Sequence, residues 1–94
     1  MTISVIHNAE DERFEAVVEG HTCVAEYHLR DGVMWMTYTG VPAAVGGRGI
    51  AAELVRAALA HARARGWKVM PSCSYVAAYM QRHPDTQDLL ARRA

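Results

Sequence analysis

The stretch Gly40–Ile50, with the sequence GVPAAVGGRGI, restricts the possible folds of this chain more than any other feature. Three glycines stand within four residues there: Gly46, Gly47 and Gly49. Glycine adopts positive φ at little cost and, without a side chain, lets another molecule approach the backbone closely. The stretch therefore predicts a tight loop whose backbone is accessible to a ligand.

A long amphipathic helix is expected directly after this loop, over Ala51–Arg65. Its apolar positions recur every four residues, at Ile50, Leu54, Ala58 and Ala62. Gly66 suits the left-handed conformation that ends helices. The start of a helix has unpaired N–H groups and partial positive charge, so loop, helix and Arg48 together favour an anion, most often a phosphate. The simpler interpretation is a turn that only leads into the helix.

The loop does not match the other common phosphate-binding sequences. It lacks the Gly-Lys-Ser/Thr ending of nucleoside triphosphate loops, and it lacks the Gly-x-Gly-x-x-Gly spacing of dinucleotide folds. A diphosphate, specifically that of coenzyme A, is therefore our preferred ligand.

The residues before the loop alternate as strands do. We predict strands over Ile3–Ile6, Phe14–Glu19, Thr22–Leu29 and Val33–Thr39. Gly20-His21 is expected to be a turn, and Asp31-Gly32 is the strongest hairpin signal in the chain. One face of the third strand is predicted to carry Cys23, Ala25, Tyr27 and Leu29. Successive hairpins imply an antiparallel meander.

After the helix, Trp67–Met70 is a short apolar run that we predict to be a fifth strand. A strand–helix–strand crossover places it parallel to the strand before the helix. A shorter helix is expected over Ser74–Arg82, with Val76, Tyr79 and Met80 inward and Ser72 or Ser74 as its N-cap. Thr86–Ala91 is expected to form a last helical turn or a loose tail. The predicted fold class is α+β.

Composition excludes several classes of function. Ten basic and ten acidic residues give zero net charge, which argues against nucleic acid as a partner. Cys23 and Cys73 have no metal-like or disulfide-like spacing, so we expect no metal and a reducing, cytoplasmic location. No apolar run approaches the roughly 20 residues that cross a bilayer, so no membrane partner is expected. Arg92 and Arg93 are expected to be a solvated tail.

Two segments carry a family resemblance. The run VPAAVGGRGIAAELVRAALAHARARG resembles the acetyl-CoA-binding segment of the GNAT acetyltransferase superfamily, Arg/Gln-x-x-Gly-x-Gly/Ala. Gly49 and Ala51 match its later two positions, and Gly47 and Arg48 match common fillers. Gly46 stands where Arg or Gln is usual. The run PSCSYVAAYMQRHP resembles the C-terminal signature, with Pro-x-Cys, of a small single-domain branch, so the resemblance covers nearly the whole chain.

The resemblance implies one acetyl-CoA-binding domain over residues 1–94, and we expect the protein to be a monomer. It implies an antiparallel meander ending in a splayed parallel strand pair, with one long helix after strand 4 and a shorter one after strand 5. The opening would pair with the pantetheine arm of coenzyme A, and the loop from Val45 to Ala51 would cap the pyrophosphate. The implied cofactor-binding residues are Val41, Val45, Gly46, Gly47, Arg48, Gly49, Ile50, Ala51, Cys73, Tyr79 and Arg82.

The implied activity is N-acetyl transfer from acetyl-CoA to an unidentified amine. Cys73 is either a nucleophile that carries the acetyl group or a residue that only lines the site, and Tyr75 and Tyr79 are candidate acids for the leaving sulfur or core residues. Arg82 and His83 either hold the adenosine end or simply finish the helix. His21 and His61 are expected on the surface. The alternative function is a non-catalytic CoA- or acyl-CoA-binding module, favoured by Gly46 and by the lack of an obvious carboxylate base.

Overall fold

A computed structural model describes residues 3–91 of the chain, so the tail prediction for Arg92 and Arg93 lies outside the described residues. Its elements, in chain order, are β1 (Ile6–Asn8), β2 (Arg13–Val18), β3 (His21–Arg30), β4 (Val33–Gly40), the 3₁₀ helix η1 (Ala43–Val45), α1 (Ile50–Arg65), β5 (Lys68–Pro71), α2 (Ser74–Arg82) and the 3₁₀ helix η2 (Pro84–Leu89). In the part described, no helix is both long and apolar enough to span a membrane.

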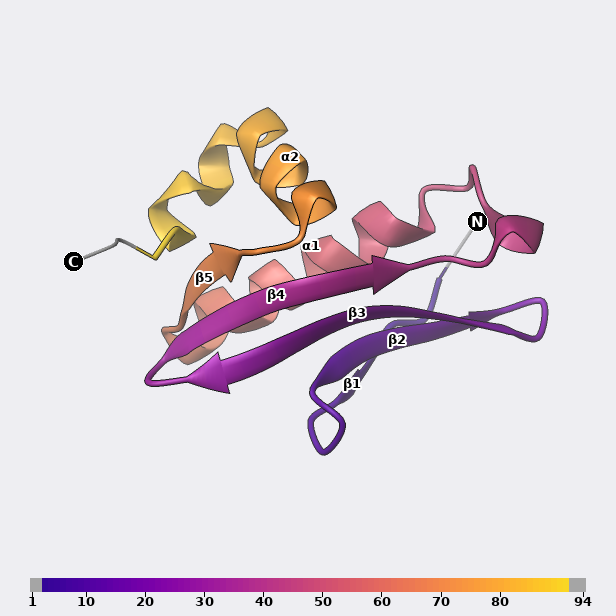
Figure 1. Cartoon of the computed structure of the whole chain (residues 1–94), viewed down its shortest axis with the longest axis horizontal. Helices are drawn as coiled ribbons and strands as arrows, with labels where there is room; N and C mark the ends of the chain where they lie inside the picture. The colour runs from indigo at the N-terminus through magenta and orange to yellow at the C-terminus, as the bar shows by residue number, and fades with distance from the viewer. Residues whose placement is uncertain (1–2, 92–94) are drawn as a thin grey trace.

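The five strands form one sheet in the order β1-β2-β3-β4-β5. The first four strands pair antiparallel through hairpins, whereas β5 pairs parallel to β4, from Val33↔Lys68 to Met36↔Pro71. Helix α1 connects this parallel pair and crosses one face of the sheet, while α2 follows β5 (Figure 1). The α+β prediction, with a meander that ends in a parallel pair, is confirmed.

The turns and strand ends differ from the prediction in detail. Asp31-Gly32 forms the predicted hairpin turn, with φ of 51° and 76°. The second hairpin turns at Glu19-Gly20 instead of Gly20-His21, and His21 is the first residue of β3. The prediction for the first strand was wrong, because the paired segment is Ile6–Asn8. His7 of this strand pairs with Phe14 of β2. The position of the strand therefore depends on its pairing with β2, which the local composition does not indicate.

A β-bulge in β4 was not predicted. Glu26 pairs with Tyr38, but the next residue of β3, Tyr27, pairs with Met36, so Thr37 is an extra residue on β4. One added residue reverses the faces to which the following side chains point. Met36 is fully buried against α1, whereas Tyr38 is 53% exposed on the opposite face, which we call the outer face of the sheet. Thr39 is thereby turned inward.

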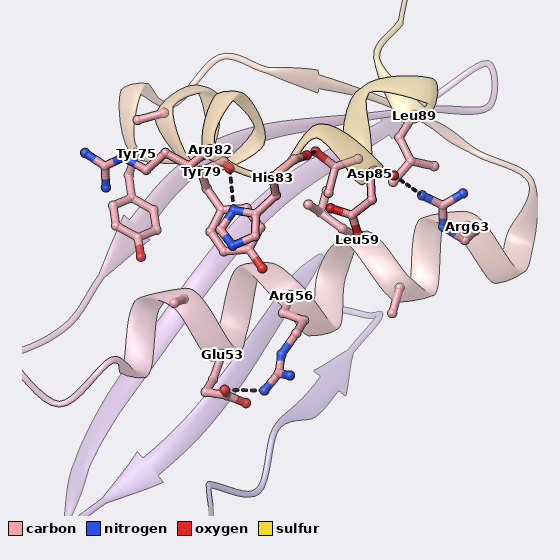
Figure 2. A pocket seen from close by; sticks show the side chains of 14 residues that line it. Glu53, Arg56, Leu59, Arg63, Tyr75, Tyr79, Arg82, His83, Asp85 and Leu89 are labelled. Carbon is pink, nitrogen blue, oxygen red and sulfur yellow. Dashed lines mark hydrogen bonds and ion pairs between the residues drawn. The ribbon is translucent and has the colours of Figure 1, made fainter.

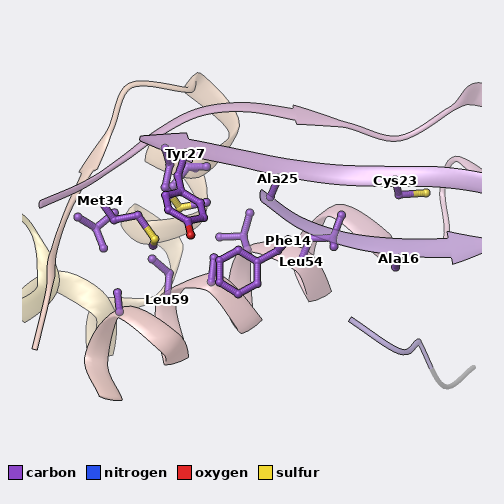
Figure 3. Close-up of a cluster of buried hydrophobic side chains, with 14 of the residues drawn as sticks. Phe14, Ala16, Cys23, Ala25, Tyr27, Met34, Leu54 and Leu59 are labelled. Carbon is purple, nitrogen blue, oxygen red and sulfur yellow. The ribbon is translucent and has the colours of Figure 1, made fainter. Parts of the chain in front are cut away.

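The core lies between the sheet and α1 (Figure 3). The predicted apolar face of α1 is confirmed, since Leu54, Ala58 and Ala62 have no exposed surface. Cys23, Ala25 and Tyr27 of β3 are buried as expected. Leu29 is 38% exposed, because it lies near the end of the β3–β4 hairpin. On α2, Val76 and Met80 are buried and Tyr79 is only half-buried.

His61 is half-buried, whereas the sequence predicted it to lie on the surface. Its ring lies 4.4 Å from the ring of His7 and 5.2 Å from that of Trp67, between α1 and the sheet. His7 in turn stacks on Phe14 at 4.3 Å, and its Nε2 lies 2.6 Å from the Tyr27 hydroxyl. His7 belongs to β1, which is far from His61 in the sequence. The helical periodicity of α1 alone therefore does not indicate that His61 contacts it.

The chain after β5 closes the structure. Neither Ser72 nor Ser74 caps α2; the N-cap is Cys73, and no side chain there makes a capping hydrogen bond. The segment expected as a helical turn or a tail contains η2, after which Leu90 bridges to Val69 of β5. The Ala91 N–H donates to the Val69 carbonyl at 2.9 Å, which covers the free edge of β5 at that point.

Candidate functional site

The glycine loop presents a series of unused backbone donors. The N–H groups of Val45 and Gly46 donate to the carbonyls of Pro42 and Ala43 in the η1 turn. No group among residues 3–91 accepts from the N–H groups of 47–52. The Gly49 carbonyl accepts the first helical bond, from Glu53, so these donors stand at the start of α1. Unpaired N–H groups and the helix dipole together make a site for an anion.

Two of the three glycines have the backbone conformation that their residue type favours. Gly47 and Gly49 both have φ of 75°, whereas Gly46 is extended with φ of −67°. A Cβ at Gly47 or Gly49 would meet no atom within 4 Å, so packing does not explain them. An N-cap Ser, Thr or Asp would satisfy the first N–H groups with its side chain, and Gly49 leaves them open.

Arg48 lies beside this loop but is held by Glu19. Its guanidinium donates to the Glu19 carboxylate at 2.5 and 3.4 Å, which ties the loop to the β2–β3 turn. The hydrogen bond from Arg48 lowers the pKa of Glu19, and the charge of Arg48 adds to this effect. Arg48 is therefore near the predicted anion site while its charge is partly neutralised.

Strands β4 and β5 separate immediately beyond their parallel pairs. The last pair is Met36↔Pro71, and one further bond joins the Cys73 N–H to the Met36 carbonyl at 2.9 Å. Beyond this point, from Thr37 to Gly40, no strand within residues 3–91 pairs with the edge of β4 that faces β5. We call this gap the strand opening; it corresponds to the predicted splay.

Cys73 lies at the base of the strand opening. Its sulfur is 3.6 Å from the Thr39 hydroxyl, an arrangement that depends on the bulge at Thr37. Burial opposes ionisation of this thiol, but the N–H groups of Val76 and Tyr75 at the start of α2 and the Thr39 hydroxyl outweigh it, so the pKa of Cys73 is below its ordinary value. A thiolate at a helix N-terminus is a nucleophile. Cys23, in contrast, is fully buried in the core.

A groove of about 710 Å³ runs between α1 and the pair α2 and η2. Three predicted residues line it, Tyr75, Tyr79 and Arg82. Figure 2 shows Tyr75 and Tyr79 pointing from α2 toward α1, where Glu53 and Arg56 form an ion pair. The groove begins at Ala52, the last residue with an open N–H group, so the loop and the groove are continuous along α1.

Tyr79 is fixed by an aromatic neighbour within the groove. Its ring stacks on that of His83 with centroids 3.9 Å apart, and Nδ1 of His83 donates to the Tyr79 carbonyl at 2.7 Å. Burial raises the pKa of Tyr79 more than the nearby Arg56 lowers it. The phenol therefore keeps its proton and can act as a hydrogen-bond donor.

The structure separates the predicted residues into groups. Val45 and Ile50 have fully buried side chains, so only their backbone atoms face the loop. Ala51 is half-buried at the start of α1, and Val41 is half-buried, packs against the core and lines a small hollow beside Tyr38. Cys73 does not line the α1–α2 groove with Tyr75 and Tyr79. In the described range no cluster of His, Cys, Asp and Glu could hold a metal ion.

Arg56 and Thr39 were not predicted as site residues from the sequence. Arg56 is part of the wet face of α1, and its place less than two turns after the glycine loop was the available signal. Thr39 had no such signal, because its inward direction depends on the bulge.

The fold and the loop together define a class of protein in which a helix N-terminus meets an open parallel strand pair. A sequence model of this class, described as GCN5-related N-acetyl-transferase, matches residues 13–89. The chain therefore belongs to the GCN5-related N-acetyltransferase family.

A solved structure supports the same fold. The chain is similar to the NMR solution structure of a GCN5-like protein from Staphylococcus aureus, with a TM-score of 0.75 and 21% sequence identity. The alignment covers 97% of this chain and 90% of that one. At this identity the likeness concerns the arrangement of helices and strands.

Proposed function

We propose that this protein transfers the acetyl group of acetyl-CoA to an amine. The observation that carries the proposal is the run of unused N–H groups from 47 to 52, which follows β4 in the chain and reaches the start of the α1–α2 groove at Ala52. A pyrophosphate at this helix start would receive these donors together with the positive end of the helix dipole. Its two arms would then point toward Cys73 and toward Tyr79.

Each arm of coenzyme A meets suitable chemistry. The pantetheine arm has amides that can bond to the unpaired edge of β4 between Thr37 and Gly40. The adenosine end would lie in the α1–α2 groove, where the Tyr79 and His83 rings offer a stacking surface. Arg56 and Arg82 line the same groove and supply positive charge for a phosphate.

The residues at the base of the opening can serve two routes of transfer. In direct transfer, a neutral amine forms a C–N bond to the acetyl carbon while the C–S bond breaks; the nitrogen then loses a proton, and the departing sulfur takes one up. In the covalent route, the Cys73 thiolate first forms a bond to the acetyl carbon and releases the CoA thiolate, and the amine then displaces Cys73. The lowered pKa of Cys73 favours the covalent route.

A binding module without catalysis is the second candidate. It is favoured by Gly46, which leaves a position without the usual side chain, and by Arg48, whose charge Glu19 partly neutralises. Neither feature removes the backbone donors, so both candidates predict binding of acetyl-CoA, and only the first predicts transfer.

Calorimetry and mass spectrometry test the proposal in sequence. Titration with acetyl-CoA should give saturable binding, and ATP should bind much more weakly because it lacks the pantetheine arm. Incubation with acetyl-CoA should then add about 42 Da to Cys73 or acetylate an added amine. Cys73→Ser, with its less reactive hydroxyl, should lose the adduct and retain binding. Absence of acetyl-CoA binding would overturn the proposal, and binding without adduct or turnover would leave the module.

A further inference from the structure

The strand opening has two sides, and only one of them is covered. On the inner side lie Cys73, Thr39 and the first turn of α2. On the outer face no helix of residues 3–91 packs against the sheet, so the second substrate has a free path to the opening from there.

A shallow hollow of about 250 Å³ lies on this outer face at the level of the opening. Its lining comes from the ends of β3 and β4 and from the segment after β4: Thr22, Val24, Tyr38, Gly40, Val41 and Pro42. Tyr38 covers Gly40 so closely that a Cβ at Gly40 would stand 2.6 Å from the Tyr38 hydroxyl oxygen. Val24, Val41, Pro42 and the Tyr38 ring give the hollow apolar walls, which suit an alkyl chain or an organic cation.

Glu26 stands next to this wall, because it is the cross-strand partner of Tyr38 on β3. It is half-buried, and it makes no ion pair or side-chain hydrogen bond with any of residues 3–91. Its other neighbour across the sheet is Arg13, whose guanidinium is 2.6 Å from Glu15 and 3.9 Å from Asp11. The Arg13 guanidinium thus already pairs with two carboxylates, and Glu26 makes no ion pair with it.

The distance from Glu26 to the strand opening indicates which kind of acceptor fits the outer face. Strand β4 lies between them, and neighbouring strands are about 4.8 Å apart, so the two points are about 10 Å apart. Glu26 is therefore too far from the opening to hold the nitrogen that reacts there. It is placed to hold a second, protonated nitrogen of the same acceptor.

We infer that the acceptor is an aliphatic diamine or polyamine that lies across the outer face, with one ammonium on Glu26, its alkyl chain on Tyr38 and its free amine at the strand opening. This inference rests on the proposed acetyl transfer and specifies its second substrate. Glu26 acts as a positioning residue for the acceptor and does not contact the acetyl group.

Acceptor length and charge provide the test. With acetyl-CoA as donor, 1,7-diaminoheptane should show a KM about tenfold lower than that of heptylamine, since only the diamine gains the charged contact. Glu26→Gln should remove this difference and leave the calorimetric Kd for acetyl-CoA unchanged. Glu10→Gln removes the same charge from an exposed residue that makes no side-chain hydrogen bond or ion pair in the described chain, and it should keep the difference.

The outcomes separate this inference from the proposed function. Loss of acetyl-CoA binding by the unmodified protein would count against the proposed function. Transfer to both amines with equal KM, or a difference that survives in Glu26→Gln, would overturn the diamine assignment alone. If neither amine is acetylated, amide shifts of Thr22, Val24 and Glu26 on addition of the diamine to the CoA-bound protein would still support it. The absence of both turnover and shifts would overturn it.

Discussion

The two ends of α1 use the same residue in the same conformation for opposite purposes. Gly49 at the start has φ of 75° and ψ of 17°, and Gly66 at the end has φ of 74° and ψ of 22°. At the end, the N–H groups of Gly66 and Trp67 donate back to the Ala62 and Arg63 carbonyls. At the start, the N–H groups find no acceptor in residues 3–91. One end is closed by the fold, and the other is left for a ligand.

The packing explains how an open end remains ordered. Ile50, the first residue of α1, is 1% exposed and anchors the helix start in the core. The donors are therefore held rigidly while they remain unpaired, and a ligand does not have to order them. A binding site commonly has unpaired polar groups that the surrounding fold holds in place. The start of α1 has this property, whereas the end of α1, whose N–H groups are paired, only stabilises the fold.

The first prediction extends the comparison to the two cysteines, which differ in the same way as the helix ends. Cys73 lies at the start of α2 beside Thr39, whereas Cys23 is fully buried. Iodoacetamide should modify Cys73 at least about a hundredfold faster than Cys23, because Cys23 reacts only after the core opens. The rate at Cys73 should follow a pKa below the ordinary 9.0, and Thr39→Val should move that pKa upward. Equal rates at the two thiols would contradict the assignment.

The second prediction compares two matched variants, Gly49→Ala and Gly66→Ala. Both substitutions place a methyl group in open space at nearly the same positive φ, so each should cost about 1 kcal/mol of folding stability. Only Gly49→Ala should weaken acetyl-CoA binding, by about tenfold, because its methyl group stands where an anion approaches the donors. Calorimetry combined with urea denaturation separates the two effects. Equal changes in affinity would show that the two ends of α1 do not differ in function.

The third prediction concerns pH at the closed end of α1. Burial lowers the pKa of His7, and the nearby His61 and Arg65 lower it further. The folded state therefore takes up a proton on His7 less readily than the unfolded chain, and the free energy of unfolding should fall as pH falls through 6.5. His61→Phe keeps a ring in the cluster and removes the electrostatic effect of His61 on the pKa of His7, so it should reduce this fall. Urea titrations between about pH 5 and pH 8 test this, and an unchanged slope in the variant would argue against it.

The smallest effect is expected at the Arg48–Glu19 ion pair. Both side chains are exposed to solvent and salt, so Glu19→Gln should change stability little. The variant releases Arg48, and acetyl-CoA binding should strengthen about two- to threefold at low salt, with the gain lost at high salt. Weaker binding in Glu19→Gln would mean instead that Glu19 holds Arg48 in its useful position.

Local signals in the sequence predicted the elements that depend on a few neighbouring residues. Asp31-Gly32 and Gly66 were predicted correctly because only residues that tolerate positive φ fit those turns. The apolar repeat through Leu54 and Ala58 fixed the buried face of α1 for the same reason, since helical geometry alone sets it. The parallel placement of β5 followed from the crossover rule.

The remaining features depend on contacts between distant parts of the chain. No sequence pattern around Thr37 indicates the bulge there. Because of this bulge, Thr39 faces Cys73 and Tyr38 faces outward. His61 was predicted to lie on the surface because its partners His7 and Trp67 come from other elements, which the pattern of α1 does not indicate. The α1–α2 groove likewise needs both helices in place, so the position of Arg56 opposite Tyr79 could not be read from α1 alone.

An amide titration compares the two ends of α1 directly in one experiment. When acetyl-CoA is added to ¹⁵N-labelled protein, the resonances of Gly47, Arg48, Gly49 and Ile50 should shift to saturation, while those of Gly66 and Trp67 should remain in place. Unshifted resonances at the start of α1 under saturating acetyl-CoA would contradict the account.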